Sequence, residues 1–388
     1  MISTSFSRDV DTSLVERAIK LQPLLAKNAE RTESLRQVVP EVIEALEESG
    51  LFEVVVPKWA GGHGATMATQ LAVAAELGRA CASSAWVQTL INVTTWIASR
   101  TPVAEKLFSA GPRPRFCGVL APSGKAVPVP GGYRVTGQWG FSSGSFCANW
   151  HTGGVFIYDE AGNMAGLGAV LVPRCDFTIK DTWFVAGMCG TSSNTVVLED
   201  VFVPAEHIIL NSAIGTREAR EPADRWSLGS VFALILAGPL LGAARACADI
   251  VTQKAPGKPI SYTSYSSTKE SIVAATEIAR AQLDIDTAWL HAFQAAAYID
   301  AVGAGATPDH GLEARLRGQC GYLTAMLRQG VNTLLDVGSA ASFASSNIIQ
   351  RHWRDINVGS RHAFLSTNIS YETYGRSLFG LDPVLLFV

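Results

Sequence analysis

The chain has 388 residues, with 31 lysines and arginines against 34 aspartates and glutamates, so its formal net charge is only −3. It contains no block of basic residues, and we therefore expect neither nucleic acid nor a membrane surface as a partner. A chain of this length can bury a large core and form two or three structural regions. These features favour an enzyme that acts on small molecules.

The cysteines are scattered along the chain without any Cys-x-x-Cys pair. They are Cys81, Cys117, Cys147, Cys175, Cys189, Cys247 and Cys320. This spacing speaks against a disulfide framework and against a zinc site, so no metal is expected. The first nine residues also lack the apolar run of a secretory signal. We expect a cytoplasmic protein whose cysteines are reduced and mostly buried.

The first region, residues 1–115, is predicted to be helical. Asp11 can cap a first helix, Pro40 fits the first turn of a second, and Gly50 ends that second helix. A third helix is expected from about Thr66 to Arg79. A fourth begins near Ser84, and its tryptophans at helical spacing are more typical of a core than of a pocket lining.

Near Arg115 the pattern of apolar residues changes from helical spacing to alternation. The strands expected there are residues 131–137, 153–158, 169–173 and 195–204. Turn residues separate them. We predict a middle region, residues 116–215, that forms an antiparallel sheet or barrel.

After about residue 216 the helical spacing returns. The predicted helices are 226–252, 266–303, 311–340 and a segment around His362. Glycines and a proline interrupt the apolar run from Leu228 to Ala244, so a helix buried in a bundle is more economical than a membrane span. The order is helices, strands, then helices. Without strand and helix alternation or a Gly-x-Gly-x-x-Gly fingerprint, a doubly wound nucleotide-binding fold is not expected.

Four short motifs follow one another along the chain. They are Val56-Pro57 with Gly61-Gly62, Gly131-Gly132-Tyr133-x-Val135-x-Gly137, Val201-Phe202-Val203-Pro204-Ala205 and Arg351-x-x-Arg354-Asp355. In this order and at these distances they resemble the acyl-CoA dehydrogenase fold over nearly the whole chain. The resemblance implies a mainly α fold with a central β domain: an N-terminal helical domain (1–115), a middle β-barrel (116–215) and a C-terminal four-helix bundle (216–388). It also implies a homotetramer.

The position of the catalytic base distinguishes two activities within this fold. In a dehydrogenase of this fold the catalytic glutamate either follows the Arg-Asp pair or lies on the helix after the β region. Here the corresponding place after Arg354-Asp355 is Ser360-Arg361-His362-Ala363, with no carboxylate. The helix after the β region, residues 226–248, contains no Asp or Glu either. The chain is more similar to the flavin-dependent monooxygenases of this fold, the oxygenase components of two-component aromatic hydroxylases. Two further motifs support this resemblance: Trp139-x-Phe141-x-Ser143-Gly144 and Gly187-Met188-x-Gly190-Thr191-x-Ser193.

This resemblance implies roles for individual residues. Ser143 would hold the N5 proton of reduced flavin, and His362 would act as general base on a phenol or ring N–H, or at least orient that group. The other expected flavin contacts are Phe141, Ser142, Thr191 and Ser192, with Gly338 and Ser339 placed where a neighbouring subunit closes over the cofactor. The expected substrate contacts are Trp86, Thr94 and Trp96.

The implied reaction uses reduced flavin (FADH2 or FMNH2) from a separate NAD(P)H-flavin reductase, with molecular oxygen as co-substrate. It forms a C4a-hydroperoxyflavin and hydroxylates a small phenol-like or indole-like substrate. Thr94 stands where related hydroxylases often have a second histidine, and Cys189 where they often have a basic residue, which leaves the substrate and FMN versus FAD open. Three alternatives also stay open: oxygenation at nitrogen or sulfur, an acyl-CoA dehydrogenase with another base, and a silent flavin-binding scaffold.

Overall fold

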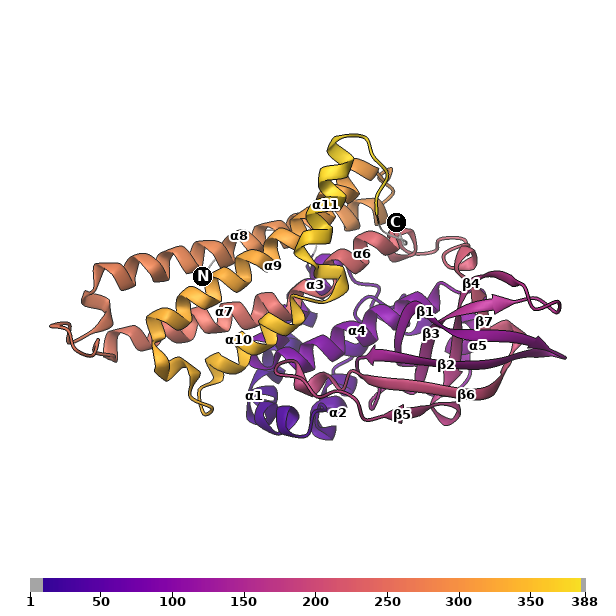
Figure 1. Ribbon diagram of the computed structural model, residues 1–388, viewed down its shortest axis with the longest axis horizontal. Helices are drawn as coiled ribbons and strands as arrows, with labels where there is room; N and C mark the ends of the chain where they lie inside the picture. The colour runs from indigo at the N-terminus through magenta and orange to yellow at the C-terminus, as the bar shows by residue number, and fades with distance from the viewer. Residues whose placement is uncertain (1–9, 385–388) are drawn as a thin grey trace.

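The computed structural model describes residues 10–384, so the expectation about a signal in the first nine residues lies outside the described residues. The elements follow the predicted order of helices, strands and helices (Figure 1). The helices of the first region are α1 (Thr12–Ser34), α2 (Pro40–Glu48), α3 (Met67–Ala80), α4 (Ala82–Ser99) and α5 (Ala104–Ser109).

The predicted helix ends in the first region are confirmed. The Asp11 carboxylate accepts a hydrogen bond from the Ser13 N–H at 2.9 Å, which caps α1. Pro40 occupies the first turn of α2, where its missing N–H costs nothing. Gly50 follows the end of α2 with φ +70, a conformation that glycine adopts without strain.

The middle region forms one sheet. Its strands are β1 (Phe116–Val129), β2 (Gly132–Ser142), β3 (Trp150–Tyr158), β4 (Met164–Pro173), β5 (Thr178–Lys180), β6 (Asn194–Pro204) and β7 (Ile208–Leu210). The order β5-β6-β2-β1-β3-β4-β7 leaves β5 and β7 as edges, so the hydrogen-bonded sheet of the described residues is open rather than a closed barrel.

The prediction of a purely antiparallel sheet is wrong for one pair, because β1 and β3 run parallel. β2 pairs antiparallel with β1 and so returns the chain to the end where β1 begins. The short turn after β2, residues 143–149, then leads into β3 on the other side of β1 at that same end. This crossing turn carries Ser143.

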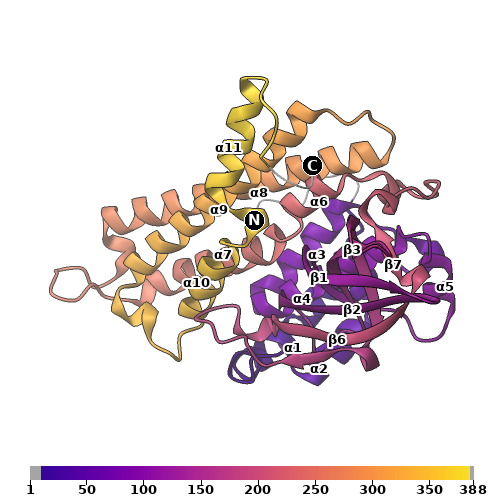
Figure 2. The ribbon, with the colours of Figure 1, turned by 45° about the vertical axis from the view of Figure 1, so that its right-hand side comes forward.

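The last region contains α6 (Leu228–Leu234), α7 (Ala237–Lys254), α8 (Ile272–Gly303), α9 (His310–Gly338), α10 (Ile348–Gly359) and α11 (Thr367–Leu378). In Figures 1 and 2, α7, α8, α9 and α10 lie side by side as a bundle, and α3 packs against α7. The predicted helix 226–252 is divided, because α6 ends before α7 begins. By length and composition Leu228–Gly257 could cross a bilayer, but 94% of its most apolar window is buried inside the protein.

One hydrophobic core joins the three regions, since Leu14 of α1, Trp139 of β2 and Leu334 of α9 belong to the same buried cluster. The proposed domain boundaries near residues 115 and 215 fall between elements of secondary structure. The place where the helices and the sheet meet is therefore a continuous and rigid surround for a site.

Candidate active site

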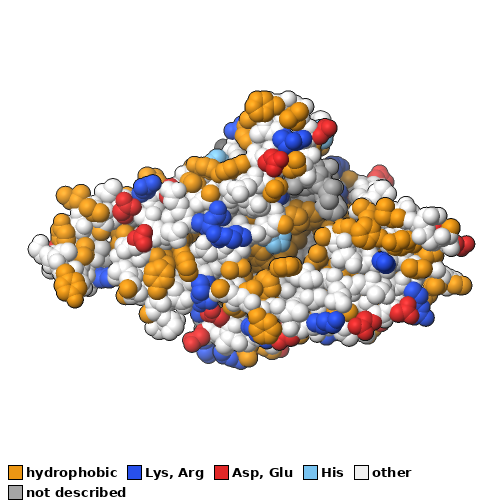
Figure 3. Space-filling view, viewed as in Figure 1, with side chains coloured by type: hydrophobic (Ala, Val, Ile, Leu, Met, Phe, Trp, Pro, Cys, Tyr) orange, Lys and Arg blue, Asp and Glu red, His pale blue; other side chains and the backbone are white. Residues whose placement is uncertain are grey.

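His362 lies in a break between helices, so the prediction that it sits on a helix is wrong. α10 ends at Gly359, and the His362 N–H donates to the Gly359 carbonyl at 3.0 Å. His362 then caps a single 3₁₀ turn, Ala363–Leu365 (η11). From α9, the Arg317 guanidinium donates to the Ala363 carbonyl at 2.9 Å and holds this turn. Figure 3 shows hydrophobic side chains lining a hollow between the helical bundle and the sheet.

The hydrogen bonds of the His362 ring define its tautomer. The Phe364 N–H donates to His362 Nδ1 at 3.2 Å. Burial, and next the positive charge of Arg317, lower the pKa of His362 to about 4, so the ring is neutral at pH 7. With Nδ1 accepting, a neutral ring carries its proton on Nε2. His362 therefore presents a hydrogen-bond donor rather than a basic lone pair.

Aromatic rings form a wall around His362. The Trp86 ring of α4 meets the imidazole edge-on, with centroids 5.7 Å apart, and the centroid of the Phe364 ring lies 5.0 Å from that of the imidazole. Phe364 in turn stacks on Phe232 of α6 at 4.7 Å. Neither Phe232 nor Phe364 was expected from the sequence to be part of the site. Phe232 lies in the most apolar run of the chain and has the pattern of a core residue.

Ser143 lies in the crossing turn after β2, and a set of buried hydroxyl groups backs it. The Ser143 Oγ lies 2.6 Å from Ser193 Oγ, which lies 2.7 Å from Thr191 Oγ1. The Gly144 N–H donates to the Thr191 carbonyl at 2.9 Å, and the Ser145 hydroxyl donates to the Ser192 carbonyl at 2.9 Å. These bonds clamp the crossing turn to residues 188–193, so the structure brings Ser143, Thr191 and Ser192 together as expected from the sequence.

Phe141 precedes this turn with φ +62 and is 72% exposed, which is unusual for a large aromatic residue. Its ring meets Trp183 edge-on at 5.8 Å. The neighbouring Ser142 is buried, and its hydroxyl donates to the Trp139 carbonyl at 3.0 Å. Phe141 and Trp183 thus expose aromatic surface next to the buried hydroxyl of Ser143.

Met188 connects the hydroxyl turn to the His362 side of the site. A Cβ built on Gly359 would lie 2.9 Å from Met188 Cε and 3.2 Å from the Trp86 ring, so Met188 and Trp86 both pack closely against Gly359. The Met188 N–H donates to the Asp355 carboxyl of α10. Burial raises the pKa of Asp355 to about 7, although this hydrogen bond opposes the rise. The Arg-Asp motif therefore holds the turn at residues 187–193 against α10.

Two expected substrate contacts have different surroundings. Thr94 is 7% exposed on α4, and its hydroxyl is bonded to the Leu90 carbonyl at 2.7 Å. Trp96 is fully buried, packs on Trp226 with ring centroids 5.7 Å apart, and donates to the Ala223 carbonyl. Trp96 is a core residue with no surface for a substrate, and we leave it out of the proposed site.

The comparisons with known proteins agree with this geometry. Residues 18–104 match the family model of the acyl-CoA dehydrogenase N-terminal domain, and residues 234–367 match that of the C-terminal domain. The chain is 30% identical to the flavin-dependent monooxygenase oxygenase subunit HsaA of Rhodococcus jostii over 95% of this chain and 98% of the relative. The chain belongs to the flavin-dependent monooxygenases of the acyl-CoA dehydrogenase fold.

Other members of this monooxygenase family are equally similar. The oxygenase component of an FADH2-dependent resorcinol hydroxylase from Rhizobium sp. is 30% identical, and the alignment covers 95% of each chain. The structure of XiaF from Streptomyces sp., solved with FADH2 and glycerol, superimposes with a TM-score of 0.94 at 33% identity and covers 97% of each chain. The similarity extends over the whole length of the chain.

A flavin-dependent monooxygenase needs a flat apolar contact and polar groups for the isoalloxazine ring, and the residues here fit that need. Phe141 offers exposed aromatic surface, and Ser143 offers a buried hydroxyl beside it. The Ser360 hydroxyl, two residues before His362, is 1% exposed and has no hydrogen-bond partner within residues 10–384. A buried hydroxyl without a partner is costly unless a ligand completes it.

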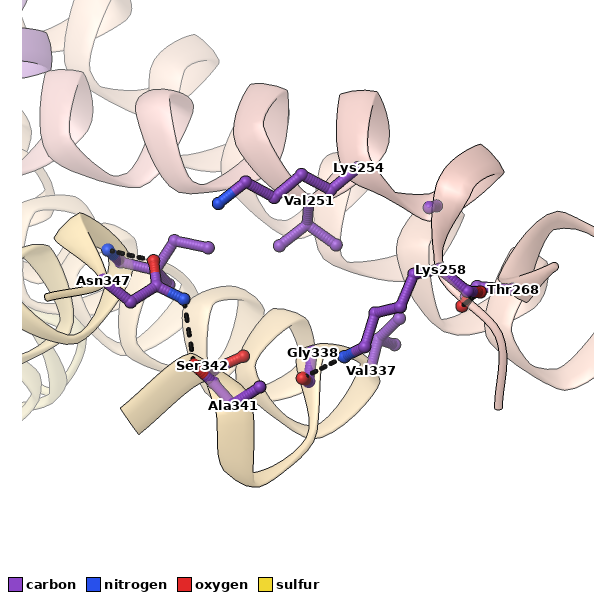
Figure 4. A pocket seen from close by; sticks show the side chains of 11 residues that line it. Val251, Lys254, Lys258, Thr268, Val337, Gly338, Ala341, Ser342 and Asn347 are labelled. Carbon is purple, nitrogen blue, oxygen red and sulfur yellow. Dashed lines mark hydrogen bonds between the residues drawn. The ribbon is translucent and has the colours of Figure 1, made fainter. Parts of the chain in front are cut away.

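Within a single subunit, Gly338 and Ser339 lie far from His362 and Ser143. α10 separates them from His362, and its 12 residues span about 18 Å. Gly338 lines a pocket of about 170 Å³ at the far end of the bundle (Figure 4), and Ser339 follows it in the chain. Lys258 donates to the Gly338 carbonyl and, at 3.2 Å, lies beside Ser339 Oγ. Burial, and next the charge of Lys254, lower the pKa of Lys258.

Proposed function

We propose that this chain takes reduced flavin from a separate NAD(P)H-flavin reductase and hydroxylates a small phenol-like or indole-like substrate. The observation that carries the proposal is the neutral His362 held between Trp86 and Phe364, where a dehydrogenase would place a carboxylate. Within residues 10–384, His362 has no ion pair with a carboxylate. Relatives named as resorcinol and indole-3-acetate oxygenases act on substrates of this kind.

The proposed reaction balances as a monooxygenation. Reduced flavin, when bound, supplies two electrons and two protons with which oxygen is activated. One oxygen atom replaces a ring hydrogen of the substrate as a hydroxyl group, and the other leaves as water. The chain itself binds and orients the substrate, excludes bulk water and holds protons at defined atoms.

Each side of the proposed site has a separate task. The Nε2–H of His362 donates a hydrogen bond to the substrate oxygen and so orients the ring carbon that is to be hydroxylated. The rings of Trp86 and Phe364 hold an aromatic substrate edge-on. Phe141, Ser142, Ser143, Thr191 and Ser192 hold the flavin ring. Of the two roles expected for His362 from the sequence, this geometry favours orientation over proton abstraction.

We further propose that the Lys254 and Lys258 pocket receives an anionic end of the flavin bound to a neighbouring subunit, at Gly338 and Ser339. Two lysines crowded into one partly buried pocket favour a phosphate group there.

The exposed Leu283 and Leu290 of α8 support a homotetramer, because burying such side chains is favourable. All seven cysteines are free, which suits the reducing cytoplasm.

The test mixes purified protein with photoreduced FAD or FMN under anaerobic conditions and then adds ¹⁸O₂ with a panel of phenols and indoles. We expect a hydroxylated product that carries one ¹⁸O atom from the gas and none from labelled water. The ratio of hydroxylated product to hydrogen peroxide measures how efficiently the enzyme couples the oxidation of reduced flavin to hydroxylation of the substrate. The control uses the same mixture without protein.

Two outcomes contradict the proposal. A dehydrogenase would keep oxidised flavin and lose its absorption on addition of an acyl-CoA, without any requirement for oxygen. A silent scaffold would bind flavin and give only peroxide with every substrate. In either case the hydroxylase function is wrong for this chain.

A further inference from the structure

Three buried hydroxyl groups form a continuous chain behind Ser143. Ser143 Oγ contacts Ser193 Oγ at 2.6 Å, Ser193 Oγ contacts Thr191 Oγ1 at 2.7 Å, and Thr191 Oγ1 donates to the Met188 carbonyl at 2.8 Å. These four residues are between 1% and 6% exposed. Bulk water therefore cannot easily replace any link of the chain.

The chain of hydroxyls has one direction, because it ends on a carbonyl that can only accept. Each hydroxyl has a single hydrogen to donate. Thr191 gives its hydrogen to the Met188 carbonyl, so it must accept from Ser193. Ser193 then donates its own hydrogen to Thr191, so it must accept a hydrogen bond from Ser143. The hydrogen of Ser143 thus points inward, and only its lone pairs remain for a ligand.

The Met188 carbonyl is a firmly fixed end point. It also accepts from the Trp183 indole N–H at 3.0 Å and from the Thr191 N–H at 3.1 Å. On its other side, the Met188 N–H is held by the buried carboxyl of Asp355. Successive hydrogen bonds that run in one direction polarise and strengthen one another. Reversing the chain would set the Thr191 hydroxyl oxygen against the Met188 carbonyl oxygen at 2.8 Å with no hydrogen between them.

We infer that Ser193 and Thr191 are positioning residues that make Ser143 an obligate hydrogen-bond acceptor, and that they thereby select reduced over oxidised flavin. The inference rests on the proposed function, in which Ser143 faces flavin N5. Reduced flavin carries a hydrogen at N5 and can donate it to Ser143. Oxidised flavin has only a lone pair at N5, which would meet the lone pairs of Ser143. The site would then load reduced flavin and release the oxidised form after turnover.

The test measures two dissociation constants for each variant, that of oxidised flavin in air and that of reduced flavin under anaerobic conditions. In Ser193→Ala the Ser143 hydrogen is free to rotate toward the ligand, so oxidised flavin should bind more tightly and reduced flavin less tightly. We expect the ratio of the oxidised to the reduced constant to fall by about threefold to tenfold, the range of one neutral hydrogen bond. Thr191→Val removes the next link and should lower the same ratio.

Two variants serve as controls. Thr191→Ser keeps the hydroxyl and should keep the wild-type ratio. Ser145→Ala removes a buried hydroxyl from the same turn, but that hydroxyl donates to the Ser192 carbonyl and lies outside the chain, so its ratio should also stay unchanged. A general loosening of the turn would weaken both redox forms together and leave the ratio constant.

The inference is overturned if Ser193→Ala and Thr191→Val both bind flavin with the wild-type ratio, or if Ser145→Ala lowers the ratio as much as they do. Failure of the proposed function has a different signature, because the wild-type protein would then give no ¹⁸O-labelled product with any substrate. A wild-type enzyme that hydroxylates, with a ratio that Ser193→Ala leaves intact, contradicts the inference alone.

Discussion

His362 shows how a single backbone contact defines the chemistry of a side chain. The Phe364 N–H occupies Nδ1, so a proton taken up at Nε2 would have to join one already there. The low pKa of about 4 has the same consequence, because it makes the ring a weak base at neutral pH. The imidazole is suited to donating a hydrogen bond that holds the substrate oxygen, and with it the ring carbon to be hydroxylated, in place.

This role predicts different outcomes for two substitutions of His362. His362→Ala should lower the rate of hydroxylation by about 10²-fold, the usual cost of a substrate held out of position. His362→Gln should retain more than a tenth of the wild-type rate, because its amide can donate to the substrate while its oxygen accepts from Phe364. Single-turnover product formation with reduced flavin measures both rates.

Flavin affinity is the control for these variants, since neither substitution touches the hydroxyl chain at Ser143. If His362 were a general base, glutamine could not replace it, and His362→Gln would be as slow as His362→Ala. That result would restore the role that the sequence first suggested.

At the scale of elements, local chemistry made much of the fold predictable. Asp11, Pro40 and Gly50 act through backbone contacts within a few residues of themselves, so the ends of α1 and α2 follow from the sequence. The change from helical to alternating spacing near Arg115 likewise places the start of the middle region, although β1 itself was not among the expected strands. These features depend on near neighbours, and near neighbours are visible in a sequence.

Other features depend on contacts between distant segments and could not be predicted from spacing. The parallel pairing of β1 with β3 arises from the crossing turn, whose path the alternation of residues does not reveal. The hydroxyl chain joins Ser143 to Ser193 across 50 residues, and of its members only Ser143 and Thr191 were expected to contact flavin. Residue 359, the last of α10, has no room for a side chain because Met188 and Trp86 from other elements pack tightly against it.

The contact between α10 and the turn at residues 187–193 gives a prediction at this scale. A Cβ on Gly187 would lie 2.3 Å from the Arg354 carbonyl oxygen, which is backbone and cannot move alone. Gly187→Ala should therefore lower the free energy of unfolding by about 1–3 kcal/mol, the range of an overpacked core. It should also raise the fraction of oxygen lost as peroxide, because the displaced turn carries Met188 and Thr191.

A glycine in an open part of a helix provides the matched control. Gly375 of α11 has no atom within 4 Å of its added Cβ. Gly375→Ala should raise stability by about 0.5–1 kcal/mol through helix propensity alone. Thermal unfolding of the two variants measures the contrast. Equal stability of Gly187→Ala and the wild type would show that α10 does not clamp the turn.

At the scale of the whole molecule, buried and half-buried histidines in different regions couple folding to pH. His151 lies in β3, His352 in α10 and His362 in the site. Burial lowers the pKa of His151 and of His352 to about 3, the latter also through Arg351 and Arg79, and that of His362 to about 4. Asp355 acts in the opposite direction, because burial raises its pKa to about 7.

These four groups predict a steep loss of stability as the pH falls from about 6.5 toward 5. Over this range the unfolded chain binds protons on three histidines that stay neutral when folded, while the folded chain binds one more on Asp355. Unfolding thus takes up about two net protons, and stability should fall by about 2.7 kcal/mol per pH unit near pH 5.

His352→Leu removes a ring whose two nitrogens lack hydrogen-bond partners within residues 10–384, and it should halve this slope. His310→Ala, at a histidine whose side chain is 95% exposed, should not change it. Chemical denaturation between pH 5 and 6.5 measures the slope, and a wild-type stability that stays constant over that range would show that these histidines are protonated in the folded protein.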